Sequence, residues 1–516
     1  MVYSFGGGAI KSSVFRAVII VALFSILTRV LGFLFRIYLS RELGAELLGV
    51  YQVAFSVFMV FIVIVASGLP LTVSKQTAKY KVTNNASGMY GTVSGALIIG
   101  AVVAILICGV FIFFKDYIIK MFADARTMDI LLTLLPAVVF SAVYSAFRGS
   151  LWGTKNYFFV SFSEFIEQVA RILFFIVLAK FIFPQFNGAY LAGVSMSLGC
   201  FISMLFMVGV YFFNRRKLTN PQSYFKPIIK SALPITGVRA ATSLIQPLIA
   251  VLFPLMLVVS GHSTEQAMSL YGIAMGMAFP LLFLPSTIVG AMSFTLIPDL
   301  SVSIAQNNSK DVEQKIRSNI FFTMLISVLF IPFFVGAGPQ ICQFLYNNTL
   351  AGVYLSKSAI VMLPLGLSNI TSSILNTLNL EVRSFVHNII GGIVLILCVI
   401  GLSWCMGVDA LILGFGLCMT VTSVMNLIKI KHSINIKLNI LKPLFCMALF
   451  LVPSAILCNF VCGIATKTLN LFWGVAFGCV ISVICFIVLC WTFKLLDVVS
   501  IVCKFLPKKC KKVHNL

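Results

Sequence analysis

Charged residues are scarce in this chain of 516 residues: Asp, Glu, Lys and Arg make up 10% of it, while 60% of its residues are hydrophobic. A typical soluble domain carries about 25% charged residues, because its surface must be hydrated. So few charges cannot cover a chain of this length, which excludes a row of soluble domains of roughly 150 residues each. The sequence therefore predicts a protein whose main solvent is lipid.

Acidic residues are scarcer still, with 14 Asp and Glu against 37 Lys and Arg and a net charge of +23. In a soluble protein this excess would suggest a nucleic-acid partner. Here no stretch interleaves basic residues with aromatics on a polar surface, so we expect no nucleic acid to bind. Basic loops on the cytoplasmic side of a membrane account for the same charge.

The sequence lacks the spacings of a metal site or of a catalytic set. Most of the 14 cysteines lie in apolar runs, where cysteine packs as a small hydrophobe. Cys458 and Cys462 are four residues apart, but no His or further Cys nearby completes a zinc set. We expect no metal, no cofactor and no catalytic residue. The tail cysteines Cys503 and Cys510, among lysines, are candidates for acylation.

Apolar runs of about 20 residues, each long enough to cross roughly 30 Å of hydrocarbon, recur along the whole chain. They predict an all-α polytopic membrane protein with about 14 transmembrane helices. The fourteen runs are 14–38, 47–69, 90–114, 129–150, 157–181, 187–213, 228–257, 270–298, 318–339, 353–378, 385–405, 408–429, 442–463 and 470–494.

Loop charges predict the orientation. With the N-terminus in the cytoplasm, the cytoplasmic loops and tail collect 26 Lys and Arg residues and the outer loops seven. This bias follows the positive-inside rule and predicts a multi-pass protein of the cell membrane with both termini cytoplasmic. Three outer-loop carboxylates, Asp116, Asp124 and Asp129, are interpreted as a solvated loop, with an ion- or sugar-binding edge as the alternative.

The chain also repeats itself at an offset of 228 residues. Pro70 closes the second run and Pro298 the eighth, and Pro136 and Pro364 share the same offset, both in Leu-Pro pairs. An even number of helices in each repeat makes the repeats parallel. We expect an N-terminal six-helix lobe (1–215), a C-terminal six-helix lobe (216–430), and two additional helices with a basic tail (431–516).

Six ionisable residues inside the predicted spans are singled out, because each charge within the membrane costs about 2.5–3.5 kcal/mol on insertion scales. Glu164, Glu167 and Arg171 stand at i, i+3 and i+7 and form one polar stripe. One interpretation is a Glu167–Arg171 pair that only holds helices together. The other is a hydrated cavity between lobes, in which arginines grip an anion. The six residues are Arg29, Arg36, Glu164, Glu167, Arg171 and Arg239.

Several segments resemble the multidrug/oligosaccharidyl-lipid/polysaccharide (MOP) exporter superfamily. The stretch Thr28–Arg36 followed by Leu43-Gly44 is similar to its first helix. The order of the other segments resembles the stage V sporulation protein B branch of polysaccharide biosynthesis proteins. These segments are Gly68–Lys75, Phe147–Gly153, Glu164–Arg171 and Ala278–Pro298.

The resemblance implies two six-helix lobes, like those of MATE transporters and the MurJ flippase, around a cavity that opens alternately to each side. It also implies movement of an undecaprenyl-pyrophosphate-linked oligosaccharide or peptidoglycan precursor, in spore cortex or cell-surface polysaccharide synthesis. Arg29 and Arg239 would contact the pyrophosphate, with Arg36 near the cavity mouth and Arg171 among the binding residues. Glu164 and Glu167 would be the acidic or gating residues.

We therefore expect a flippase, not an enzyme, with a lipid-linked anionic sugar as substrate. We expect a monomer among membrane lipids, with cell-wall synthesis enzymes as candidate partners. No P-loop is present, so an ion gradient, the membrane potential or the substrate gradient must drive transport. The alternatives are a multidrug/cation antiporter of the same superfamily, a polyprenol-dependent glycosyltransferase, and a non-transporting scaffold for cell-wall enzymes.

Overall fold

The computed structural model describes residues 9–214, 216–306, 308–434 and 441–492. Within these ranges all regular structure is helical and no strand occurs. The all-α prediction is confirmed, and each of the fourteen predicted runs lies on a helical segment. Cys503 and Cys510, the candidates for acylation, lie outside the described residues.

Twelve of the described helical segments are long and apolar enough to cross a membrane. The first, Val21–Val82, contains two of the predicted crossings, because the chain continues as helix through a backbone break at Gly44, where φ is 71°. The predicted crossing at 157–181 is not among the twelve, since three charged residues interrupt its apolar sequence. The twelve segments thus account for thirteen of the predicted crossings, and the helix Tyr157–Val177 corresponds to the fourteenth.

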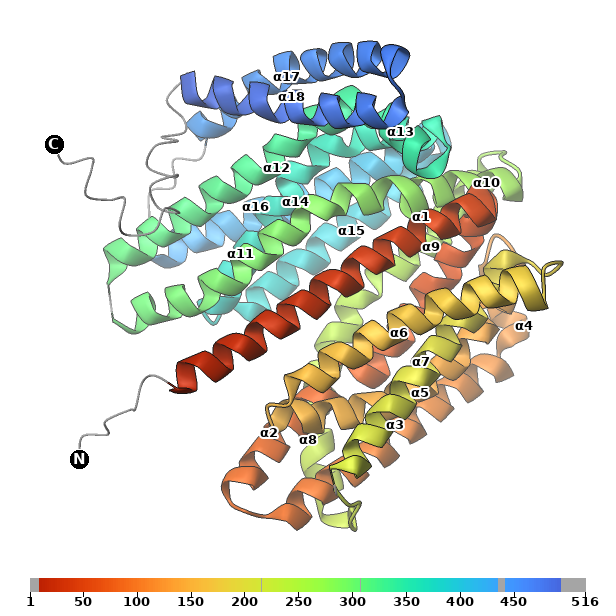
Figure 1. Ribbon diagram of the computed structural model, residues 1–516, viewed down its shortest axis with the longest axis vertical. Coiled ribbons are helices and arrows are strands. Elements are labelled where there is room, and N and C mark those ends of the chain that lie inside the picture. The colour runs from red at the N-terminus through yellow and green to blue at the C-terminus, as the bar shows by residue number, and fades with distance from the viewer. Residues whose placement is uncertain (1–8, 215, 307, 435–440, 493–516) are drawn as a thin grey trace. The chain divides into compact units, whose positions relative to one another are not determined.

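The chain divides into two compact units, residues 1–272 (unit 1) and residues 273–516 (unit 2). In unit 1, α5 packs against α1, α2, α3 and α7, while α6 contacts both α1 and α7 (Figure 1). Helix α8 contacts α1, α2 and α3, and α10 contacts α1 and α9. The helices are α1 (Ala9–Ala66), α2 (Leu69–Val82), α3 (Ala86–Phe113), α4 (Lys115–Ile118), α5 (Arg126–Gly153), α6 (Tyr157–Val177), α7 (Gly188–Phe213), α8 (Phe225–Ser243), α9 (Ile245–Val259) and α10 (Thr264–Tyr271).

In unit 2, α15 and α16 form an antiparallel pair, as do α17 and α18, and α12 contacts α13, α14, α17 and α18. Helix α14 also packs against α11 and α16. The chain enters this unit through a π-helical segment, η4 (Gly272–Ala278). The helices are α11 (Phe279–Ala305), α12 (Ser309–Tyr346), α13 (Thr349–Ser358), α14 (Met362–Thr377), α15 (Glu381–Met406), α16 (Val408–Ile434), α17 (Leu441–Thr468) and α18 (Leu471–Thr492).

The contact boundary at residue 272 lies after α8–α10, whereas the repeat in the sequence suggests a boundary near residue 215. The two boundaries are defined by different properties of the chain. A repeat boundary marks where a duplicated sequence begins again, and a contact boundary marks which helices pack together in one conformation. The predicted six-helix lobes stay a prediction about the repeat.

Small residues let helices of unit 1 approach closely. A Cβ on Gly49 of α1 would lie 2.0 Å from the carbonyl oxygen of Met268 in α10, and a Cβ on Gly272 would lie 2.0 Å from that of Ala45. Only glycine fits at such backbone-to-backbone contacts, which are typical of membrane helices. Asparagine caps start other helices: the side chain of Asn85 accepts from the backbone N–H of Gly88 at 2.7 Å.

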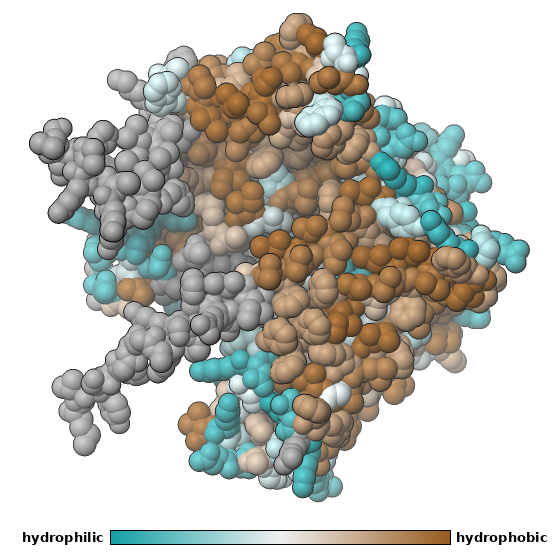
Figure 2. Space-filling model, in the orientation of Figure 1, coloured by the Kyte–Doolittle hydropathy of each residue, from teal (hydrophilic) through white to brown (hydrophobic). Residues whose placement is uncertain are grey.

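Hydrophobic side chains cover much of the exposed surface of the helices (Figure 2). In unit 1 they include Ile105, Leu106 and Leu173, each more than half exposed. Hydrophilic residues gather at the ends of the helices in the same view. A water-exposed protein does not normally expose so large an apolar area, so these surfaces face lipid.

Two predicted helix ends are wrong. Pro70 starts a further helix, α2, instead of leading into a loop, because the missing N–H of proline costs nothing in the first turn of a helix. Lys75, Lys79 and Lys81, counted as loop charges, therefore lie on α2. At the equivalent position of the repeat, α11 does not end at Pro298 but continues to Ala305.

Candidate functional site

The two arginines of α1 lie in different surroundings. Arg29 is exposed, and within the described part of the chain it forms neither an ion pair nor a hydrogen bond. Arg36, two helical turns further on, is half-buried, and its Nη2 donates to Oε1 of Gln52 at 2.9 Å. Gln52 is only 6% exposed and belongs to the second half of α1, beyond the break at Gly44. The break thus lets the helix fold back so that its own two halves share a polar contact.

The first acidic residue of the α6 stripe has a partner on α5. Glu164 Oε1 and Arg148 Nη2 form an ion pair at 2.6 Å, with both side chains about one-third exposed. The guanidinium of Arg148 also stacks over the ring of Trp152, at 4.3 Å from its centroid. Arg148 lies within α5 and neutralises Glu164.

The other two members of the stripe do not pair with each other. Ser203 Oγ of α7 donates to Glu167 Oε2 at 3.0 Å. Arg171 donates to Gln168 Oε1 and lies 3.1 Å from the sulfur of Met196. Although a spacing of four residues permits an ion pair, the described residues contain no Glu167–Arg171 pair, because α7 supplies other partners to both side chains.

Arg171 connects the stripe to α1. Its guanidinium lies over the ring of Phe35, 5.4 Å from the centroid, and Phe35 precedes Arg36 in the chain. The Nε of Arg171 and the Nε2 of Gln168 are buried without a hydrogen-bond partner among the described residues. Buried donors without partners carry a free-energy cost of about 1–3 kcal/mol, so these N–H groups are available to an acceptor.

Arg239 lies on α8. It is exposed, and its Nη1 donates to the carbonyl oxygen of Ser67, at the end of α1, over a long 3.4 Å. The only described polar contact of Arg239 is thus weak, and no carboxylate neutralises its charge. Helix α8 packs against α1 and α2 at this point, where Gly68 approaches Thr236.

All six ionisable residues singled out in the sequence therefore lie in unit 1, and the structure links Arg36 and Arg171 through Phe35. Sequence reasoning missed Arg148, Gln52, Gln168 and Ser203, which partner them. Gln52 and Gln168 were detectable in principle, because a glutamine inside an apolar run is as unusual as a charge. Arg148 lay too close to the end of its run to be noticed.

The remaining charge is positive. Glu164 is neutralised by Arg148, while Arg29, Arg171 and Arg239 have no carboxylate partner among the described residues. Arginine presents a planar fork of donors suited to carboxylate or phosphate. Among the described residues, no three His, Cys, Asp or Glu side chains gather into a group that could hold a metal. No hydrogen bond, ion pair or ring contact among the described residues joins Arg29 or Arg239 to Arg171, so each of these guanidinium groups is by itself a candidate for binding an anion.

A family model described as "Polysaccharide biosynthesis protein" matches residues 14–302, more than half of the chain. The chain is 24% identical over 396 residues to stage V sporulation protein B of Bacillus subtilis, a match that covers 74% of this chain and 76% of that protein. It is 25% identical over 511 residues to the lipid II flippase MurJ of Bacillus subtilis, which covers 90% of each.

Solved structures share the fold. A lipid II flippase MurJ in an inward closed conformation matches with a TM-score of 0.67 at 15% identity, over 92% of this chain and 98% of that one. An inward-facing multidrug resistance MATE family transporter of the MOP superfamily also gives 0.67 at 15% identity, over 79% and 94%. The predicted MATE/MurJ-like fold is confirmed.

Proposed function

The chain belongs to the polysaccharide biosynthesis protein family, within the MOP exporter superfamily, and from this premise we propose that it is a flippase for a lipid-linked saccharide precursor. Its membrane helices would take the lipid-linked molecule from one leaflet to the other by alternating access. The substrate we propose is an undecaprenyl-pyrophosphate-linked oligosaccharide or peptidoglycan precursor.

One observation carries the choice of an anionic substrate. Arg29 and Arg239 are exposed on apolar helices without a carboxylate partner among the described residues. An arginine facing lipid in mid-membrane costs about 2.5–3.5 kcal/mol on insertion scales, and such residues normally face water. We infer that both arginines face an aqueous cavity, where they bind the pyrophosphate while the prenyl chain stays in lipid.

The other members of the set have supporting roles in this proposal. Arg171 lies over Phe35, the residue before Arg36, and these two arginines form a second cationic region for the phosphate. Glu167 offsets part of this charge, so the pyrophosphate is not held too tightly to leave. A multidrug/cation antiporter would need the opposite balance of charge.

Reconstitution in liposomes tests the proposal. A fluorescent undecaprenyl-pyrophosphate oligosaccharide is placed in one leaflet, and its exposure to an impermeant quencher is followed. We expect Arg29→Ala and Arg239→Ala to slow transport by about tenfold or more, because each removes a charge-assisted bidentate contact. Arg29→Lys and Arg239→Lys should retain part of the rate. Arg383→Ala, an exposed arginine at the start of α15, is the matched control and should transport normally.

Normal transport by both alanine variants would contradict a pyrophosphate contact, and transport of a cationic dye in place of the sugar would favour the antiporter. We propose further that the protein acts as a monomer without a cofactor, driven by an ion gradient, the membrane potential or the substrate gradient. Cell-wall synthesis enzymes are its proposed partners.

We also propose that both termini are cytoplasmic, because basic loops gather on that side. Single cysteines at Gln222 and Ser263, both exposed, test this in a cysteine-free background. In intact cells an impermeant thiol reagent should label the cysteine at 263 and spare that at 222. The reverse pattern would invert the orientation.

A further inference from the structure

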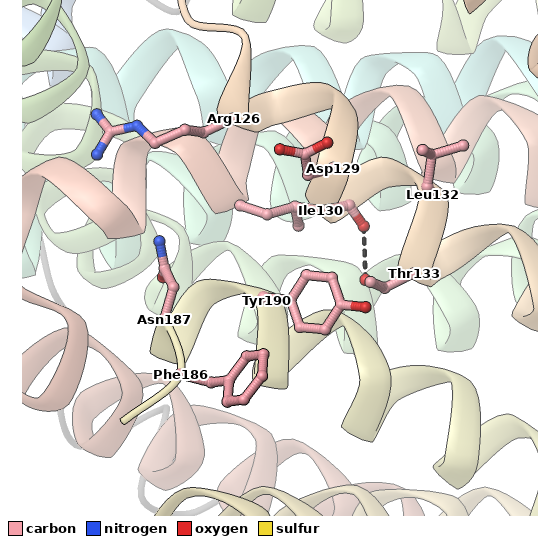
Figure 3. A pocket seen from close by; sticks show the side chains of 8 residues that line it. All are labelled: Arg126, Asp129, Ile130, Leu132, Thr133, Phe186, Asn187 and Tyr190. Carbon is pink, nitrogen blue, oxygen red and sulfur yellow. Dashed lines mark hydrogen bonds between the residues drawn. The ribbon is translucent and has the colours of Figure 1, made fainter. Parts of the chain in front are cut away.

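A groove runs between α5 and α7 of unit 1, and none of its lining residues belongs to the arginine set. At the first turns of the two helices it widens into a cavity of about 570 Å³ (Figure 3). In this view Thr133 of α5 faces Tyr190 of α7, while Phe186 and Asn187 lie at the start of α7. The polar lining is completed by Arg126 and Asp129 in the first turn of α5.

The groove continues along the same two helices as an apolar cavity of about 440 Å³. Thr133 and Tyr190 line both cavities, so the two are continuous. Below this junction the walls are hydrophobic: Pro136, Phe140, Val194, Leu198 and Phe201. The groove is thus polar at the helix ends and apolar toward the middle of the membrane-spanning segments.

The contact between the two helices closes the floor of the groove. Ser197 Oγ of α7 donates to the carbonyl oxygen of Thr133 at 2.5 Å. A Cβ on Gly193 would lie 2.0 Å from Thr133 Oγ1, so only glycine leaves room for this hydroxyl between the helices. Pro136 has no N–H, which leaves the carbonyl of Leu132, another lining residue, without its helical donor. A carbonyl acceptor is thereby left at the junction of the two parts.

Charge at the polar end favours a cationic group. Arg126 uses Nε and Nη2 to bind Asp124, at 2.7 Å from Nη2, and Nη2 also binds Glu46. Its Nη1 has no hydrogen bond within the described residues. The carboxylate of Asp129 has no partner there either. Because Asp124 and Glu46 already neutralise Arg126, the carboxylate of Asp129 leaves the polar end of the groove net acidic, while Nη1 still offers one donor edge.

We propose that this groove binds a zwitterionic phospholipid with a primary ammonium head group, such as phosphatidylethanolamine. The ammonium lies at Asp129, the phosphate accepts from Nη1 of Arg126, and one acyl chain lies along Val194, Leu198 and Phe201. Arg126 and Asp129 are three residues apart and so lie on one face of α5. A free saccharide would leave the apolar part unexplained, and an anionic lipid would meet an acidic mouth.

Lipid retention by the full-length protein tests the assignment. The delipidated protein in detergent is titrated with phosphatidylethanolamine, phosphatidylcholine or phosphatidylglycerol, and bound lipid is counted by native mass spectrometry. We expect phosphatidylethanolamine to bind most tightly. Val194→Trp, which fills the apolar part, should abolish this binding. Leu205→Trp adds the same ring at an exposed position of α7 outside the groove and should leave binding unchanged.

A second variant tests the head group without altering packing, because Asp129 is exposed. Asp129→Asn should lower the preference for phosphatidylethanolamine over phosphatidylglycerol by about tenfold, the effect of one charge-assisted contact. Asp116→Asn, an exposed carboxylate of α4 outside the groove, should not change it.

Tighter binding of phosphatidylglycerol, or equal retention by Val194→Trp and wild type, would overturn the assignment. Displacement of the phospholipid by undecaprenyl pyrophosphate would assign the groove to the transported lipid instead and would also overturn it. The arginine variants of the transport assay lie outside the groove, so failure here leaves the proposed flippase activity untouched.

Discussion

Unit 1 carries charged side chains in the middle of its membrane helices, whereas the buried polar residues described in unit 2 are Ser, Thr, Asn and His. In the described part of unit 2 the charged residues lie toward helix ends, as Lys310 and Glu381 do. Its buried polar groups include His387 and Asn426, at 8% and 0% exposure.

Four polar side chains of unit 2 form a hydrogen-bonded network around Asn426. Asn426 of α16 donates through Nδ2 to Thr371 Oγ1 at 3.1 Å and to Ser372 Oγ at 3.0 Å, both on α14. Its Oδ1 lies 2.8 Å from Nδ1 of His387 on α15. The network joins three helices and leaves little for a ligand to bind. Unit 1, by contrast, leaves arginine donors unused. The comparison teaches that polar side chains within membrane helices serve packing where their hydrogen bonds are made inside the protein. Where donors are left without partners, these side chains are suited to binding a ligand.

The largest change in the free energy of unfolding should come from a substitution at Asn426, the centre of the hydrogen-bonded network in unit 2. Asn426→Leu leaves His387, Thr371 and Ser372 without their shared partner, and should lower the free energy of unfolding by about 2–4 kcal/mol. Thermal unfolding in detergent measures this, with transport per folded molecule expected to stay normal. Thr420→Val, at an exposed position of the same helix, is the control. Equal stability of the two variants would show that the network is not structural.

Removing one partner of the Arg148–Glu164 ion pair in unit 1 should lower the free energy of unfolding by an intermediate amount. Arg148→Leu or Glu164→Leu should each cost about 1–2 kcal/mol, less than a fully buried pair because both side chains are partly exposed. The exchange Arg148→Glu with Glu164→Arg should restore most of that stability in a double-mutant cycle.

The neighbouring exchange, Glu167→Arg with Arg171→Glu, should not restore stability. Ser203 and Met196 on α7 contact the original side chains at separate positions, and neither contact survives the exchange. Recovery of stability would mean that the pair suggested by the sequence spacing operates after all.

The smallest effect should come from an ion pair near the surface of unit 2. Lys357 Nζ and Asp409 Oδ2 lie 2.6 Å apart, but their side chains are 50% and 39% exposed. Lys357→Ala should therefore change the free energy of unfolding by less than about 0.5 kcal/mol, and high salt should erase the difference. If Lys357→Ala lowered the free energy of unfolding as much as Asn426→Leu, the contrast between the charged helix ends of unit 2 and the buried network around Asn426 would be wrong.

The sequence predicted the crossings well because roughly 20 apolar residues must span the hydrocarbon whatever their neighbours are. It did not predict α2, because this helix has 14 residues, three of them lysines, and its length matches no crossing. Proline is common both just after a helix and in the first turn of one, so Pro70 alone could not show whether a helix ends or begins there.

The candidate site was only half predictable, for a related reason. Charges inside apolar runs are visible one residue at a time, which is how Arg29, Arg171 and Glu167 were found. Their partners depend on which helices pack together. The choice of Ser203 over Arg171 as the partner of Glu167 follows from the packing of α6 against α7, and spacing along α6 carries no information about it.

The π-helical segment Gly272–Ala278 also bears on how the chain passes from unit 1 to unit 2. In such a segment each N–H bonds one residue further back than in an α-helix. The backbone groups stay bonded throughout, as the membrane interior demands. The chain thus passes from residues of unit 1 into unit 2 as continuous helix, with no break that would leave a backbone amide unpaired in lipid.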